Sequence, residues 1–273
     1  MLIDGHAHAC GGYLRPEDII RSLDKDGIDK VILVPGQMGS TRTYRLPDMA
    51  TLFPKSDLIP YLNKMIGLST ALSGDAKTIP EGNAYVQSLV QACPDRVIQF
   101  FWALLQRPNI RQEIERDHKA WRFKGLKLHQ VWERFALDSP AFEAVAGFAA
   151  EKDLPIFIHL RSNRDVRNHT AFMQRHPETC FIIGHLFGLE TYIKSGVALA
   201  NTYFDISAPP FVSRHRVLQA IEHFGADKII LGSDSPYGKH NLRDNVRRVR
   251  DLPLSDHDRQ LILGGNLQRL LKL

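Results

Sequence analysis

The chain alternates between short, almost wholly apolar runs and longer segments in which apolar residues recur at helical spacing. A strand that is covered on both faces reads as such a continuous apolar run, as in a parallel sheet. We therefore predict eight strands, at residues 2–8, 30–34, 97–104, 123–129, 155–159, 180–185, 202–207 and 228–234.

The segments between these runs predict helices with recognisable first turns. Pro16 precedes two acidic residues, which suit the positive end of a helix dipole. Ser139 stands in the N-cap position before Pro140, and the helical pattern continues to Glu151. Residues 213–224, 241–251 and 255–271 follow the same pattern.

Repeated strand–helix units favour an α/β fold of one kind, the (β/α)8 TIM barrel. The alternative is an open doubly wound sheet, but no Gly-x-Gly-x-x-Gly sequence follows the first predicted strand. A barrel of this size forms one domain, so we expect residues 1–273 to be a single unit. Residues 35–82 show no clear strand–helix rhythm, and we interpret them as a long loop insertion over the barrel mouth. The alternative is an outward decoration that is unrelated to any site.

Composition and charge narrow the possible partners. The net charge of +5 is spread along the chain, and its densest cluster, residues 243–250, has the spacing of a solvated outer helix face. We therefore expect no nucleic-acid partner. No apolar stretch approaches the roughly 20 residues that span a bilayer, so no membrane association is expected. Three scattered cysteines and the lack of a signal peptide favour a cytoplasmic location.

Histidines mark the candidate chemistry. His6 and His8 are two apart in the first predicted strand, so both imidazoles point to the same face. Taken alone, the pair could equally be satisfied core histidines. Further polar residues, however, end other predicted strands, and the carboxyl ends of barrel strands form the active-site face. These residues are Lys127, His129, His159, His185 and Asp234.

Several neutral imidazoles and one carboxylate suit a divalent cation, most readily Zn²⁺, with one position left open for water. Such a cation lowers the pKa of bound water and polarises a carbonyl group. The sequence therefore predicts a metal site at the C-terminal ends of the strands.

At this point the sequence resembles the amidohydrolase superfamily, in particular its amidohydrolase-2 group of metal-dependent hydrolases and decarboxylases. The resemblance rests on ordered landmarks at residues 3–8, 94–96, 125–129, 158–159, 184–185, 231–237 and 263–266. It implies metal ligation by His6, His8, His159 and Asp234, with His185 close by as a proton shuttle or substrate polariser. One metal ion is usual in this group, whereas in other branches a lysine such as Lys127 is carboxylated and bridges two.

Two residues could act beside the expected ligands. Asp4 could accept a hydrogen bond from a ligating imidazole, or it could bond backbone groups at the start of the strand. Asp205 ends the seventh predicted strand and could compete with Asp234 for the metal.

The substrate is expected to be a small, anionic organic acid. Candidate contacts are Arg161, two residues after His159, together with Lys127, Trp132 and Tyr237. Surface salt bridges are the alternative role for arginines in general. A homo-oligomer is possible.

We expect a metal-dependent hydrolase that attacks a lactone or amide carbonyl through metal-activated water. Asp234 would take the proton from water, and His185 would hold the carbonyl oxygen. The first alternative is non-oxidative decarboxylation of an aromatic or unsaturated acid at the same site. The second is a non-catalytic barrel that only binds a ligand.

Overall fold

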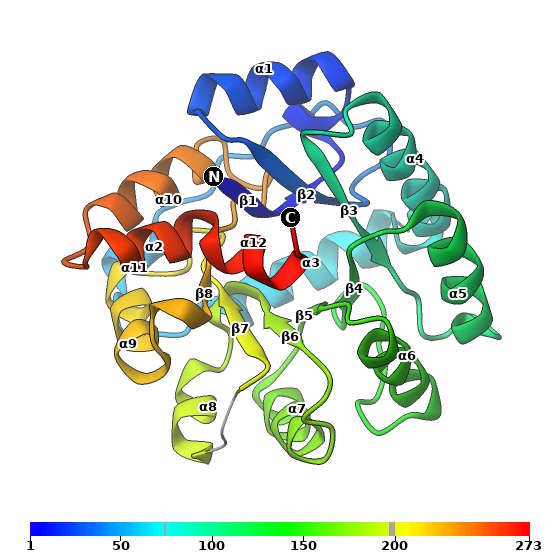
Figure 1. The fold of residues 1–273 in the computed structure, drawn as a ribbon. Coiled ribbons are helices and arrows are strands. Elements are labelled where there is room, and N and C mark those ends of the chain that lie inside the picture. Colours follow the sequence, from blue (N-terminus) through cyan, green and yellow to red (C-terminus); the bar gives the residue numbers. More distant parts are fainter. Residues whose placement is uncertain (74, 197–199) are drawn as a thin grey trace.

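The computed structural model describes residues 1–73, 75–196 and 200–273 and confirms the predicted (β/α)8 barrel. Within this part of the chain, eight parallel strands follow one another in sequence order around a nearly closed sheet (Figure 1). They are β1 (Ile3–His8), β2 (Lys30–Val34), β3 (Val97–Trp102), β4 (Gly125–His129), β5 (Ile156–His159), β6 (Phe181–Ile183), β7 (Thr202–Asp205) and β8 (Ile229–Ile230).

The barrel closes where the first strand meets the segment that follows β8. The Gly5 amide donates a hydrogen bond to the Leu231 carbonyl, and the Asp234 amide donates to the His6 carbonyl at 2.7 Å. The His8 amide then donates to the Ser235 carbonyl at 2.8 Å. The last predicted strand was expected to reach Asp234, but regular pairing ends at Ile230. Asp234 is held by this irregular pairing instead.

A bulge in β1 sets which of its residues face the barrel interior. Asp4 is paired with Val31 and Ala7 with Leu33, so β1 contains one residue more than β2 over this stretch. An extra residue reverses the alternation of side chains beyond it. Ile3 packs in the interior core, and His6 and His8 also project into the barrel, whereas Ala7 packs on the helices outside.

Two hydrophobic cores support the barrel. The interior core contains Phe100 and Phe157, and α12 (Asn266–Leu271) closes one end of it with Leu267 and Leu271. The larger core lies between the outer face of the strands and the surrounding helices. Figure 1 shows α12 across the near end of the barrel and α3 (Ile59–Ser73) across the far end. The far end is the one to which the C-terminal strand ends point.

The surrounding helices begin largely where their caps predict. Ser139 accepts a hydrogen bond from the Phe142 amide, and Ser213 does the same for the Arg216 amide. The helices are α1 (Pro16–Asp26), α4 (Ile79–Ala92), α5 (Ile110–Trp121), α6 (Pro140–Glu151), α7 (Asn163–Arg175), α8 (Leu189–Ser195), α9 (Arg214–Phe224) and α10 (Asn241–Arg250).

The single helix predicted over residues 255–271 was wrong. The segment is divided into α11 (Asp256–Gln260), a wide turn over Leu261–Gly265, and α12. Gly264 causes the break, because the Met1 carbonyl oxygen lies 2.3 Å from the place a Cβ would occupy. The backbone of residues 1–3 therefore packs so closely against residue 264 that only glycine fits there.

The connection from β2 to α4 contains α2 (Met49–Leu52) and α3. Its predicted range of 35–82 includes residue 74, which lies outside the described residues, and its last four residues belong to α4. Leu62, Met65 and Ile66 of α3 line the cavity at the strand ends. Part of the inserted segment therefore lies over the cavity at the strand ends.

Replacing two glycines by alanine should change the free energy of unfolding in opposite directions. A Cβ at Gly125 would lie 2.6 Å from the Phe100 ring, so Gly125→Ala should reduce the free energy of unfolding by about 1–3 kcal/mol through overpacking. Gly147 lies inside α6 with nothing within 4 Å of its Cβ position, so Gly147→Ala should increase that free energy by about 0.5–1 kcal/mol. Urea denaturation of both variants measures the two changes, and equal shifts would contradict this account of the core.

Candidate metal centre

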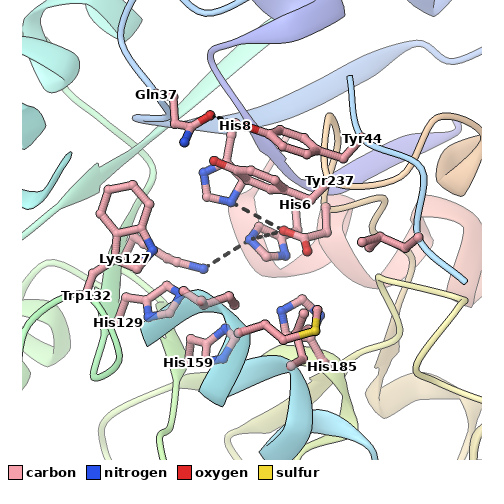
Figure 2. A pocket seen from close by; sticks show the side chains of 15 residues that line it. His6, His8, Gln37, Tyr44, Lys127, His129, Trp132, His159, His185 and Tyr237 are labelled. Carbon is pink, nitrogen blue, oxygen red and sulfur yellow. Dashed lines mark hydrogen bonds and ion pairs between the residues drawn. The ribbon is translucent and has the colours of Figure 1, made fainter. Parts of the chain in front are cut away.

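A cavity opens at the C-terminal ends of the strands. Residues from the ends of β1, β4 and β5, and from the segments that follow β6 and β8, line its floor, and Figure 2 shows their imidazoles converging there. The floor residues are His6, His8, Lys127, His129, His159, His185 and Asp234. The predicted strand-end residues therefore meet at one place.

His6, His8 and Asp234 form the tightest cluster of potential ligands. One ligand atom from each lies within 4.8 Å of the others, and all three side chains are buried. The Asp234 Oδ1 is 3.3 Å from the His8 Nε2 and 3.6 Å from the His6 Nε2. The backbone of Asp234 adopts a left-handed conformation with a φ of 60°, an uncommon geometry that often marks functional sites.

The hydrogen bond at the far side of His8 sets its tautomer. The Pro35 carbonyl oxygen can only accept, so the His8 Nδ1 must carry the proton in their 2.8 Å hydrogen bond. If the ring is neutral, its Nε2 carries no proton, and the lone pair of this nitrogen faces the Asp234 carboxylate. Two acceptors at 3.3 Å repel each other unless a positive charge lies with them.

Ser207 imposes the same tautomer on two further histidines. Its hydroxyl donates to the Asp205 carboxylate, so the Ser207 oxygen can only accept from the rings beside it. The His6 Nδ1 lies 3.1 Å and the His185 Nδ1 2.9 Å from that oxygen. Each Nδ1 therefore carries a proton, and each Nε2 is left as a lone pair in the neutral ring.

Burial keeps the His6 ring neutral. It lowers the pKa of His6 well below the ordinary value, and the nearby Lys127 lowers it further. Imidazole nitrogens and one carboxylate are the donor set that a borderline divalent cation prefers. The residues present therefore fit a metal ion, with His6, His8 and Asp234 as its nearest candidate ligands.

His159 lies beside this cluster but is bonded elsewhere. Its Nε2 lies 2.6 Å from the Asn63 Oδ1, and Asn63 donates both amide protons to the carbonyls of Leu160 and Arg161. The Asn63 oxygen must therefore accept, so the His159 Nε2 carries a proton. In this conformation His159 offers no Nε2 lone pair, and its ligation of the metal stays a prediction.

Lys127 lies at the floor of the cavity and is fully buried. Its Nζ donates to the His6 Nε2 at 3.0 Å and lies 4.0 Å from the centre of the Phe157 ring. Burial lowers the pKa of Lys127 to about 7, although Asp234 and Asp205 oppose the shift. Lys127 thus lines the cavity beside the candidate ligands, and both substrate contact by Lys127 and its carboxylation stay predictions.

The two supporting carboxylates have distinct places. Asp4 accepts from the Ser233 amide and hydroxyl at 2.8 and 2.6 Å, so its backbone-binding alternative is the one observed. Burial raises the pKa of Asp4 to about 7. Asp205 accepts from the amides of His185 and Ser207 and from the Ser207 hydroxyl. With these bonds Asp205 supports the histidines rather than competing with Asp234.

The predicted substrate contacts divide into two groups. Tyr237 and Trp132 line the cavity, as does Lys127. Arg161 does not line it: the guanidinium lies 3.5 Å from Asp165, four residues further along α7, and is 43% exposed. The expected contact between Arg161 and the substrate therefore has no support in this geometry.

Several residues of the site had no signal in the sequence. Asn63 in α3 and Ser207 after β7 bond the histidines without lining the cavity, and only these long-range partners mark them. Six cavity residues come from the connection between β2 and α4, where no periodic pattern places them. These are Gln37, Tyr44, Leu46, Leu62, Met65 and Ile66.

The fold and the site agree with comparisons to known proteins. The family described as Amidohydrolase matches residues 59–273, and the chain belongs to this family of metal-dependent enzymes. The matched range begins after His6 and His8. A search of curated proteins found no match. Among the described residues, no helix is both long and apolar enough to cross a bilayer.

Solved structures share the fold over the whole chain. A dihydroxybenzoic acid decarboxylase from Polaromonas sp. JS666, with bound manganese and 2-nitroresorcinol, has a TM-score of 0.69 at 17% identity, covering 100% of this chain and 97% of its own. A 4-oxalomesaconate hydratase from Rhodopseudomonas palustris has a TM-score of 0.66 at 15% identity, with 100% and 96% covered. A probable 2-pyrone-4,6-dicarboxylic acid hydrolase from Acinetobacter baumannii, with citric acid bound, has a TM-score of 0.67 at 15% identity, with 100% and 99% covered. Identities this low support a common fold alone.

Metal retention tests the cluster directly. His8→Ala and Asp234→Asn should each abolish stoichiometric metal, because each removes a donor from a three-residue group. His169→Asn is the matched control, since His169 is also a buried histidine but lies outside the cavity and bonds Tyr192. Elemental analysis after dialysis gives the answer. Full metal content in both cluster variants would exclude this site.

The role of His159 can be decided by competition. If its Nε2 becomes a ligand, Asn63 competes with the metal, and Asn63→Ala should tighten metal binding in a chelator titration. His159→Ala should then weaken binding by about 10–100-fold or more. Unchanged affinity in both variants would make His159 a neighbour of the metal rather than a ligand.

Proposed function

We propose that the protein is a metal-dependent hydrolase that acts on a lactone or amide carbonyl of a small organic acid. The observation that carries this proposal is the convergence of His6, His8 and Asp234 at the cavity floor, where the Nε2 atoms of both rings face the carboxylate. A divalent cation bound there would supply Lewis acidity and lower the pKa of a coordinated water.

Asp234 serves as the proton acceptor. Its carboxylate lines the cavity, so a water molecule beside a substrate carbonyl is within its reach. No lysine or arginine is paired with it among the described ion pairs, which leaves its oxygens to the metal and to a proton. General-base assistance of this kind contributes typically about 10²–10⁴-fold to the rate.

His185 polarises the carbonyl oxygen of the substrate. The Ser207 oxygen holds its Nδ1 proton, and Asp205 lies 3.7 Å from the same nitrogen. These contacts fix the orientation of the ring, whose Nε2 donates to the carbonyl oxygen when the ring carries both protons. The backbone of His185 is left-handed, with a φ of 58°, which turns the chain sharply at the end of β6.

We further propose one metal ion, with zinc as the first candidate. The second group of potential ligands, His6, His185 and Asp205, shares His6 with the first. Its carboxylate already accepts three hydrogen bonds. A second ion would have to break that network. Manganese in the Polaromonas decarboxylase makes it the first alternative to zinc.

Decarboxylation is the second candidate function. Aromatic side chains favour it, because Tyr44, Trp132 and Tyr237 line the cavity and suit a ring-bearing acid. The similar structures also include decarboxylases that act on dihydroxybenzoates. Asp234 would then deliver a proton to the ring carbon rather than accept one from water.

Two substrate panels separate the reactions. We expect the metal-loaded protein to release acid from lactones and amides, and to release no carbon dioxide from hydroxybenzoates. His185→Asn should keep its metal, since His185 is outside the first ligand group, and lower kcat by about 10²–10⁴-fold. His118→Asn, a change on α5 away from the cavity, is the control.

The opposite results are equally informative. Carbon dioxide release without lactone hydrolysis would replace the first reaction with the second. Metal-loaded protein that is inactive on both panels, while still binding small acids, would favour the non-catalytic barrel.

A further inference from the structure

The charge distribution of the cavity limits what the substrate can carry. Among the described residues that line it, Lys127 is the only lysine or arginine. Arg42 and Arg45 of the inserted segment are exposed and outside the lining, and Arg161 is paired with Asp165. Lys127 is therefore the one basic side chain of the described lining that can face an anionic group beside the metal.

This cation lies at the floor rather than in the wall. Its Nζ is 3.0 Å from the His6 Nε2, against the aromatic face of Phe157. An anionic group that reaches Lys127 must therefore lie next to the metal ligands (Figure 2). Both positive charges act on the same end of the substrate.

The wall opposite this floor is apolar. Leu46, Leu62, Met65 and Ile66 supply it, and all four come from the inserted segment between β2 and α4. Tyr44 stands beside them, but its hydroxyl donates to the Gln37 Oε1 at 2.6 Å. A carboxylate placed against this wall would lose its water without gaining a charged partner, which is strongly unfavourable.

The size of the cavity agrees with a small molecule. Its volume is about 190 Å³, less than the ~300 Å³ at which pockets for drug-sized ligands begin. A substrate with two separated anionic groups would need a second lysine or arginine within this space, and the described lining has none.

We propose that the substrate is a compact monoanion, with its single negative group at the metal and Lys127 and an apolar body against the inserted segment. This proposal rests on the proposed function, because it places the reacting group at the same metal centre. It assigns the selection of substrates to Leu46, Leu62, Met65 and Ile66, which take no part in metal binding.

The test compares benzoate with benzene-1,3-dicarboxylate as ligands of the metal-loaded protein, by calorimetry. The natural sequence should bind benzoate about tenfold or more tightly than the dicarboxylate, because the second carboxylate is buried without a partner. Met65 lies at the rim and is 50% exposed, so Met65→Arg should fold normally and place a cation in the wall. This variant should bind the dicarboxylate about tenfold more tightly than the natural sequence does.

Leu68→Arg is the matched control on the same helix. Leu68 is 67% exposed and outside the cavity lining, so this variant adds the same charge without reaching the ligand. Its affinities should equal those of the natural sequence. If Met65→Arg fails to fold in thermal unfolding, Leu46→Arg introduces the charge from a different part of the wall.

Three results would overturn the proposal: equal or tighter binding of the dicarboxylate by the natural sequence, no binding of benzoate, or the same gain in Leu68→Arg as in Met65→Arg. Binding is measured without turnover, so it separates the two hypotheses. A correct order of affinities in a protein without activity would contradict the proposed function and leave the substrate class standing.

Discussion

The site depends on the contact that closes the barrel. Four backbone hydrogen bonds join β1 to residues 231–235, and one of them runs from the Asp234 amide to the His6 carbonyl. This pairing brings the first and last strand ends of the chain together. Without it, two histidines near the N-terminus and an aspartate 226 residues after His8 would have no reason to share a cation. Barrel closure and assembly of the metal centre are therefore one event.

A buried network then determines which nitrogens face the cavity. Asp205 accepts a hydrogen bond from the Ser207 hydroxyl, and the Ser207 oxygen accepts from the Nδ1 atoms of His6 and His185. The Pro35 carbonyl accepts from the Nδ1 of His8. Gly232 makes room for this arrangement, because a Cβ there would lie 2.3 Å from an Asp205 oxygen. The donor set is consequently oriented by groups that never touch the substrate, which is the usual way in which a protein preorganises a metal site.

Sequence reasoning succeeded where the chemistry follows the strand pattern. His6, His8, Lys127 and His129 lie on inward-facing positions of apolar strands, so alternation alone places them at the mouth. It failed where partners are distant or local pairing wins. Asn63 reaches His159 from 96 residues away, which no local pattern shows. Arg161 has the spacing of a cavity residue, but it lies just before α7 and pairs with Asp165 in the first turn of that helix.

Chemistry and selectivity are carried by different parts of the chain. The ends of the barrel strands and the segments after them supply the candidate ligands, whereas the inserted segment supplies the apolar wall and is fixed to the barrel by several hydrogen bonds. Asn63 bonds the end of β5, and Asp57 accepts from the Gly188 amide at 2.8 Å beside the buried Arg216. Because these attachments hold α3 independently of Met65, the wall can change its charge while the metal centre keeps its geometry. Such a division explains how one barrel site can serve acids of different shape.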